Sequence, residues 1–151
     1  EQIDEIKSII NEFWKRAGIL DFEIKNVEVA ADGSLNVDVF IRDASLYIGE
    51  DGRNIRAFED ILRLIIKKQA KNISFIHLDI NNYREFKSEA LRELAKKAAR
   101  RARFYKQPVA LEAMSAYDRR IIHTELAVHP DIKTESVGEG RNRRVVVKYI
   151  S

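Results

Sequence analysis

One stretch of this chain has the residue types and spacing needed to hold a phosphate backbone. Residues 48–55 read Ile-Gly-Glu-Asp-Gly-Arg-Asn-Ile, so Gly49 and Gly52 are three residues apart. Glycines at this spacing let a main chain approach a sugar-phosphate backbone closely, because neither has a side chain in the way. Glu50 and Asp51, however, put two negative charges where the phosphates would pass. The loop is therefore predicted either to bind nucleic acid weakly or to have another use.

Arginines beside two glycine-containing turns are further candidate contacts. Arg53 is the first positive residue after the loop, and Arg56 follows it about one helical turn later. In the C-terminal half, Gly138 and Gly140 flank Glu139 and predict a hairpin tip that can close over a ligand. The basic residues beside this tip are Arg141, Arg143 and Arg144.

A second candidate site combines arginine and histidine on one side of a predicted helix. At about 100° per residue, Arg119, Arg120 and His123 share the polar side. The apolar side is predicted to contain Tyr117, Ile121, Ile122 and Leu126. The arginines would contact phosphate or stack on a base, and His123 would do the same, gaining charge if its pKa rises beside an anion. The alternative for His123 is a half-buried imidazole bonded to a backbone carbonyl.

Catalytic and metal-binding patterns are missing from the sequence. The histidines, at positions 77, 123 and 129, have no cysteine partners and lack the spacing of a zinc protease. Neither a nucleophile elbow nor a phosphate-binding Gly-Lys-Ser/Thr loop is present. The carboxylates around the basic helix are scattered: Glu112, Asp118 and Glu125. We therefore predict a protein that is not an enzyme and that uses no metal or other cofactor.

The composition indicates a soluble globular chain with two electrostatically different halves. Its 151 residues are 45% apolar and contain no run apolar enough to span a membrane. The absence of cysteine fits a reducing cytoplasm. Residues 1–81 carry 11 Lys and Arg against 15 Asp and Glu, a net charge of −4, whereas residues 82–151 carry 16 against 9, a net of +7. The basic half favours a polyanionic partner, with an ordinary solvated surface as the alternative.

Hydrophobic periodicity predicts the elements that position the glycine loop. We expect a helix over residues 2–17 with a stop at Gly18, then a strand with a bulge near Asn26, a turn at residues 32–33 and a second strand. The second strand is expected to bury Leu35, Val37, Val39 and Ile41. A short helix over 43–48, the loop, a helix to about residue 71 and a strand over 76–80 follow. The predicted buried stripe of the longer helix is Ile55, Phe58, Ile61, Leu62, Ile65 and Ile66.

The second half is predicted to begin with a long helix that reaches about residue 106. Its buried face is expected to contain Leu91, Leu94, Ala95, Ala98 and Ala102, and its other faces are heavily basic. A short strand over 108–111 precedes a helix over 116–128 that Ser115 caps. A hairpin-like segment then extends to Val147.

The order of elements in the first half, with Gly-x-x-Gly between two helices, resembles a type II KH domain (α-β-β-α-α-β). That resemblance implies a loop that holds single-stranded nucleic acid. Ile48 before the loop and Ile55 after it strengthen the match. The alternative is a helix-turn-helix joint whose glycines merely permit a tight turn.

The second half resembles an R-three-H domain, which is named for its Arg-x-x-x-His spacing and is associated with single-stranded nucleic acid. The more specific segments are Leu111–His123 and Gly138–Val147, together with Asn82–Glu85 at the start of the long helix. With the first half they resemble the Jag family of bacterial proteins, also called KhpB or SpoIIIJ-associated proteins, over nearly the whole chain.

The resemblance implies an α+β fold, with a KH domain at residues 1–81 and an R-three-H domain at 82–151 whose helices pack on a small mixed or antiparallel sheet. It implies a cytoplasmic protein that binds single-stranded RNA, or single-stranded DNA by the same contacts, and that is linked to envelope growth and division. A second small KH protein, or another copy of the chain, is an expected partner. The chain starts at Glu1, with neither a methionine nor a signal-like apolar run, so we expect it to be a piece of a longer polypeptide. The resemblance implies that a separate small N-terminal domain precedes these two domains in many family members.

Two hypotheses remain open from the sequence. In the first, the basic half supplies most of the RNA affinity, and the KH half, weakened by Glu50 and Asp51, supplies positioning or weak selectivity. In the second, the acidic half is a protein-interaction module that docks a partner, and contact with nucleic acid is incidental.

Overall fold

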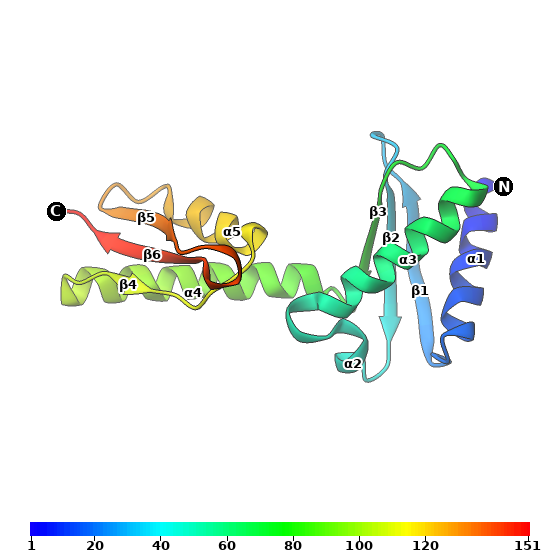
Figure 1. Ribbon diagram of the computed structural model, residues 1–151, viewed down its shortest axis with the longest axis horizontal. Helices are drawn as coiled ribbons and strands as arrows, with labels where there is room; N and C mark the ends of the chain where they lie inside the picture. The colour runs from blue at the N-terminus through cyan, green and yellow to red at the C-terminus, as the bar shows by residue number, and fades with distance from the viewer. The chain divides into compact units, whose positions relative to one another are not determined.

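The computed structural model describes residues 1–151 and separates into two compact units, Glu1–Arg84 and Glu85–Ser151 (Figure 1). We call them unit 1 and unit 2 and describe each by itself. Both combine helices with a three-stranded sheet, so the fold class is α+β, as predicted. No helix combines the length and the apolar character that crossing a membrane requires.

Unit 1 has the order of elements that the periodicity predicted. They are α1 (Gln2–Arg16), β1 (Phe22–Val29), β2 (Leu35–Ile41), α2 (Ser45–Ile48), a 3-10 turn (Glu50–Gly52), α3 (Arg53–Gln69) and β3 (Ile76–Ile80). The sheet order is β1-β2-β3, with β2 antiparallel to β1 and parallel to β3. Side chains of α1 and α3 pack with those of the sheet in one apolar core.

The local signals in unit 1 have clear structural causes. Gly18, which follows the C-cap residue Ala17 of α1, has a φ of 81°, the positive φ at which helices commonly end on glycine. The register between β1 and β2 shifts between Ile24 and Asn26, so the predicted bulge is confirmed and Lys25 is the extra residue. The predicted inward side chains of β2 are all buried.

The buried stripe of α3 is narrower than predicted. Ile55, Leu62 and Ile66 are buried, whereas Ile61 is 47% exposed and was wrongly assigned to the core. At about 100° per residue, Ile61 lies a full residue step to the side of Leu62, beyond the strip that faces the sheet. Leu64 is also exposed, so α3 presents apolar side chains to solvent.

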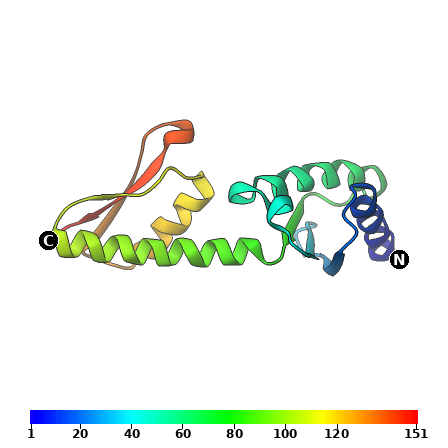
Figure 2. The ribbon, with the colours of Figure 1, turned by 90° about the horizontal axis from the view of Figure 1, so that it is seen from below.

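Unit 2 contains most of α4 (Tyr83–Tyr105), β4 (Val109–Ala110), α5 (Ala116–Leu126), β5 (Ile132–Val137), a 3-10 turn (Gly140–Asn142) and β6 (Arg144–Tyr149). Its sheet has the order β4-β6-β5 and is entirely antiparallel. Figure 2 shows α4 as a long straight helix beside the smaller elements of this unit. The predicted cap of α5 is confirmed, because the Ser115 hydroxyl accepts a hydrogen bond from the Asp118 amide at 3.2 Å.

The core of unit 2 is built from small side chains on α4 and branched ones opposite. The buried set is Leu91, Ala95, Ala98, Ala99, Ala102, Leu111, Ile122, Leu126, Ile132, Val145 and Val147. Two apolar side chains predicted to be inside are instead exposed, Leu94 by 38% and Tyr117 by 65%. Leu94 lies at the margin of the buried face of α4, and Tyr117 lies in the first turn of α5, well away from the line through Ile122 and Leu126.

Candidate nucleic-acid interface

The loop of unit 1 needs both of its glycines. Gly49 has a φ of 74° and Gly52 a φ of 72°, a region that residues with a Cβ rarely adopt. Asp51 between them also has a positive φ, of 52°, which aspartate tolerates better than most residues. Three residues with positive φ within four positions make the sharp turn from α2 to α3.

Close packing is a second reason for the glycines. A Cβ on Gly49 would lie 2.7 Å from Cγ of Asn54, and a Cβ on Gly52 would lie 2.9 Å from the Tyr83 ring. The Asn54 amide also donates to the Leu46 carbonyl at 2.7 Å. Both glycines are therefore required by the geometry of the turn itself.

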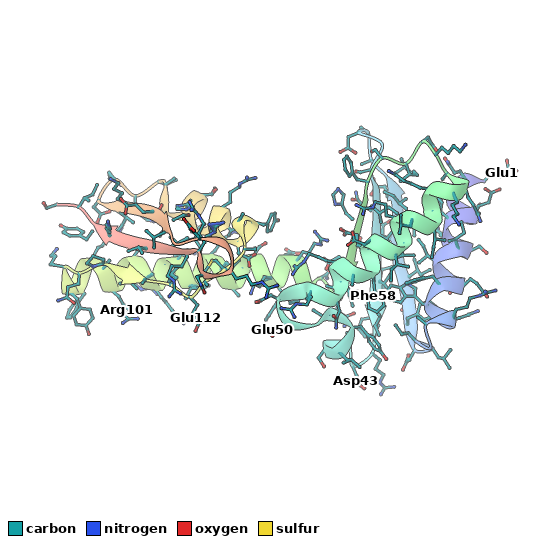
Figure 3. All side chains as sticks on the ribbon, viewed as in Figure 1. Glu1, Asp43, Glu50, Phe58, Arg101 and Glu112 are labelled. Carbon is teal, nitrogen blue, oxygen red and sulfur yellow. The ribbon has the colours of Figure 1, made fainter.

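The charges around the loop are mixed. Glu50 lies on the 3-10 turn between α2 and α3 (Figure 3) and is exposed. Arg53 is exposed in the first turn of α3, where the helix dipole disfavours a cation and favours an anion near it. Arg56 is also exposed, but its Nη1 donates to the Asp51 carbonyl at 2.9 Å and so helps to hold the loop.

In unit 2, His123 fastens α5 to the sheet. Its Nδ1 lies 2.6 Å from Oγ1 of Thr134, and its Nε2 lies 2.8 Å from Oγ of Ser136. Thr134 and Ser136 are alternate residues of β5, so their side chains point to the same face of the strand. The imidazole is half-buried, as the alternative interpretation proposed, but its partners are two hydroxyls and not a backbone carbonyl.

The surroundings of His123 favour its neutral form. Burial of the ring, and after it the positive charge of Arg119, lower the pKa of His123 from its ordinary value of 6.5. A neutral imidazole donates from one nitrogen and accepts at the other, and a hydroxyl can do either, so both contacts are satisfied in the same tautomer. In the free protein His123 is therefore a positioning residue, and the positive charge lies on the arginines around it.

Those arginines gather at one end of unit 2. The Met114 amide donates to the Arg143 carbonyl at 3.1 Å, which joins the hairpin tip to the start of α5. Nε of Arg119 donates to the Ser115 carbonyl at 3.4 Å on the same turn of α5. We call the following residues of α5 and the hairpin the arginine cluster: Arg119, Arg120, Arg141, Arg143 and Arg144.

The arginine cluster has no internal neutralisation. None of its side chains forms an ion pair with a carboxylate, whereas Arg103 in the same unit is paired with Asp131 and Lys148 with Glu135. Inside the hairpin, the Arg143 and Arg144 side chains donate only to carbonyl oxygens, at 3.1 and 3.3 Å. Planar guanidinium groups without anionic partners are suited to phosphate, which they can bind through two parallel hydrogen bonds.

The hairpin tip is held by its own hydrogen bonds. Gly138 has a φ of 89°, and a Cβ there would lie 2.9 Å from the Asn142 carbonyl oxygen. The amides of Asn142 and Arg143 donate to the carbonyls of Glu139 and Gly140, at 3.1 and 3.3 Å. These hydrogen bonds fix the backbone from which the arginines of the hairpin tip project, and the Arg141 side chain is exposed.

The structure separates the predicted site residues into two groups. Gly49, Gly52, Arg53 and Arg56 belong to unit 1, and the arginine cluster with His123 belongs to unit 2. The sequence interpretation missed Thr134 and Ser136, whose only signal is their alternation on β5. No group of three or more histidine, cysteine, aspartate or glutamate side chains is arranged to hold a metal ion.

Two comparisons relate the chain to known proteins. The family model of the R-three-H domain matches residues 89–149. An RNA-binding protein KhpB of Clostridium symbiosum is 34% identical over 113 residues, which are 75% of this chain and 51% of the relative. KhpB of Bacillus subtilis is 34% identical, with 70% and 52% covered, and KhpB of Lactiplantibacillus plantarum is 32% identical, with 82% and 41% covered. The chain thus spans about half the length of the curated relatives that it matches.

Proposed function

Since the chain belongs to the Jag/KhpB family, we propose that it binds single-stranded RNA and that the arginine cluster of unit 2 supplies most of the affinity. The observation that carries this proposal is the set of arginines without carboxylate partners beside His123. Cations that are not neutralised within the protein release counterions when they meet phosphates, and this release drives binding to nucleic acid.

We further propose that residues 1–81 form a type II KH domain and residues 82–151 an R-three-H domain. The order of helices and strands in unit 1, with Gly49 and Gly52 between α2 and α3, supports the first assignment. Glu50 and Asp51 oppose phosphate at the loop, so the KH domain contributes positioning or weak selectivity through Gly49, Gly52, Arg53 and Arg56. The N-terminus of α3, which begins at Arg53, carries a partial positive charge that favours a phosphate at this loop.

His123 has two roles in this proposal. In the free protein it holds α5 against β5, so that Arg119 and Arg120 are presented beside the hairpin tip. In the complex, a phosphate close to the ring would favour the imidazolium and add a positive charge to the contact. Because the pKa of His123 is lowered in the free protein, this charge would be acquired on binding.

The wider role that the family suggests is regulatory and not catalytic. We propose a cytoplasmic protein that acts on RNA by binding, in the control of envelope growth and division, without a cofactor. The names of the relatives, which describe RNA-binding proteins, support this proposal.

A second candidate function is protein docking by unit 1. Ile61 and Leu64 are 47% and 65% exposed on α3, although both are large and apolar. They favour a partner that covers this helix, either another KH protein or a second copy of the chain. Sedimentation of the chain alone and after Leu64→Glu measures self-association, with a loss of dimer expected only if copies dock through α3.

The test of RNA binding uses the intact chain and two matched pairs of substitutions. Arg119→Gln with Arg120→Gln removes two charges from the cluster, and Arg53→Gln with Arg56→Gln removes two from the loop. We expect the first pair to weaken binding to single-stranded RNA more and to reduce the salt slope by about 1.4, from about 0.7 for each lost phosphate contact. An equal or larger loss from the second pair would transfer the main contact to the loop.

A further inference from the structure

The outer side of α4 carries a row of cations that ends in an aromatic ring. Lys97, Arg100, Arg101 and Phe104 follow one another at i, i+3, i+4 and i+7, so they lie in one line along the helix. This line is opposite the buried face of the same helix, and Figure 3 shows Arg101 on the side of α4 away from α5 and β6. All four side chains are exposed. We call them the α4 stripe.

Several other cations of α4, and the lysine that follows it, are used inside the protein. Arg92 pairs with Glu89 at 2.9 Å and Lys96 with Glu93 at 3.2 Å, both on the helix itself. Arg103 is held by both carboxylate oxygens of Asp131, and Nζ of Lys106 lies 3.6 Å from the centre of the Tyr149 ring.

The cations of the α4 stripe form no such pair. The carboxylates of α4, at positions 85, 89 and 93, all precede it, so no acid interrupts the row from Lys97 to the end of the helix. The stripe therefore presents three positive charges that the helix does not neutralise.

The aromatic ring at the end of the stripe is largely exposed to solvent. Phe104 is 79% exposed and Tyr105 is 63% exposed, and their rings meet edge to face with centroids 4.9 Å apart. Water disfavours an apolar surface of this size, so leaving both rings outside the core is unfavourable unless something covers them. A nucleic-acid base fits, because it stacks on an aromatic face while its phosphates meet neighbouring cations.

We propose that the α4 stripe, with Tyr105, is a second contact surface for single-stranded nucleic acid, in which Phe104 stacks on a base and Lys97, Arg100 and Arg101 meet the phosphates. This inference rests on the proposed function, since it extends the RNA contact of unit 2. The charge of the stripe selects a polyanion, and the ring beside it selects a polyanion with exposed flat bases.

The aromatic end of the stripe and the arginine cluster lie toward opposite ends of the sheet of unit 2. Asp131 and Tyr149, which contact the end of α4, adjoin the start of β5 and the end of β6. The hairpin tip lies at the other end of these strands, about 17 Å away at about 3.3 Å per residue. A strand that touches both surfaces must extend along the unit, so long oligonucleotides gain a contact that short ones lack.

The test compares variants of the intact chain that carry equal changes of charge. Arg100→Gln with Arg101→Gln alters the stripe, and Arg92→Gln with Lys96→Gln removes two cations of the same helix that are already paired. Phe104→Ala removes the ring, with Phe86→Ala as the control because Phe86 is another exposed phenylalanine of α4. The probe is single-stranded RNA that contains 2-aminopurine, whose fluorescence is quenched on stacking.

We expect Phe104→Ala to weaken binding about fivefold or more and to abolish a component of the quenching, while Phe86→Ala changes neither. Arg100→Gln with Arg101→Gln should lower the salt slope of binding by about 1.4, and Arg92→Gln with Lys96→Gln should lower it by much less. Wild-type-like affinity and quenching in both stripe variants, with Arg119→Gln and Arg120→Gln still weakening binding, would overturn this inference alone.

Two other outcomes are separable. Failure of the unaltered chain to bind the RNA at any salt concentration would overturn the proposed function and this inference with it. Vesicles that contain an anionic lipid serve as a parallel probe. Stripe variants that lose vesicle binding but keep RNA binding would show that the surface takes a membrane, against the proposal.

Discussion

Replacing His123 with alanine tests whether this residue holds α5 on the sheet. The substitution removes the contacts to Thr134 and Ser136, at 2.6 and 2.8 Å. Each hydrogen bond contributes about 0.5–1.5 kcal/mol net. Because the ring is half-buried, water can replace part of what is lost, and we expect unit 2 to lose about 1–2 kcal/mol of stability. For a unit of this size that corresponds to a fall of about 5–15 °C in its melting temperature.

The assay follows the two units separately. Trp14 is the single tryptophan and is buried in unit 1, so its fluorescence in urea is an internal control that His123→Ala should not change. Amide hydrogen exchange in α5 and β5 gives the free energy of opening in unit 2. Ser136→Ala and the double variant complete a cycle, with a coupling of about 0.5–1.5 kcal/mol expected between the two side chains. A coupling near zero would refute the role given to His123.

Three further perturbations test other parts of the account. Because folding lowers the pKa of His123, the contribution of this residue to the stability of unit 2 should be complete above pH 6.5 and should be lost as the pH falls through the folded pKa. Urea titrations at several pH values measure this dependence, which should disappear in His123→Gln. Gly52→Ala should destabilise unit 1 more than Gly18→Ala, since a positive φ costs about 1–2 kcal/mol at both positions but only Gly52 meets a ring; equal losses in tryptophan-monitored unfolding would contradict this. Glu50→Lys with Asp51→Asn should strengthen RNA binding in filter assays, with asparagine chosen because it tolerates the positive φ, and unchanged affinity would mean that the loop does not meet RNA.

Several elements of the fold could be predicted because their signals are local. The alternation of apolar residues in β2, the phase change near Asn26 and the cap at Ser115 each depend on neighbours within a few positions. The prediction was wrong where apolar character was taken as a sign of burial. Ile61 and Tyr117 lie outside the buried line of their helices, and only the packed structure shows how wide that line is.

The candidate site was less predictable than the elements. The spacing of Arg119 and His123 identified the helix, but the partners of the imidazole are 11 and 13 residues further along the chain and depend on how β5 meets α5. For the same reason, sequence could not separate the paired cations of α4 from the unpaired ones. Arg103 looks like its neighbours in the sequence, yet Asp131 neutralises it in the fold.

The proposed division of labour between the two units would account for the acidic loop. If the arginine cluster supplies most of the affinity, the loop of unit 1 can keep Glu50 and Asp51 without loss of the complex. The acidic residues would repel the backbone of every RNA equally. Only RNAs whose bases make favourable contacts with the loop would then bind there, and this would give weak selectivity.

Amide shifts of the intact chain, recorded during titration with single-stranded RNA, would locate the main RNA contact in one unit or the other. We expect the largest changes in the first turns of α5 and at the hairpin tip, around Arg119 and Arg141, with smaller ones near Gly49 and Gly52. The opposite ranking, with the largest changes at the glycine loop and none in α5 or the hairpin, would contradict this expectation.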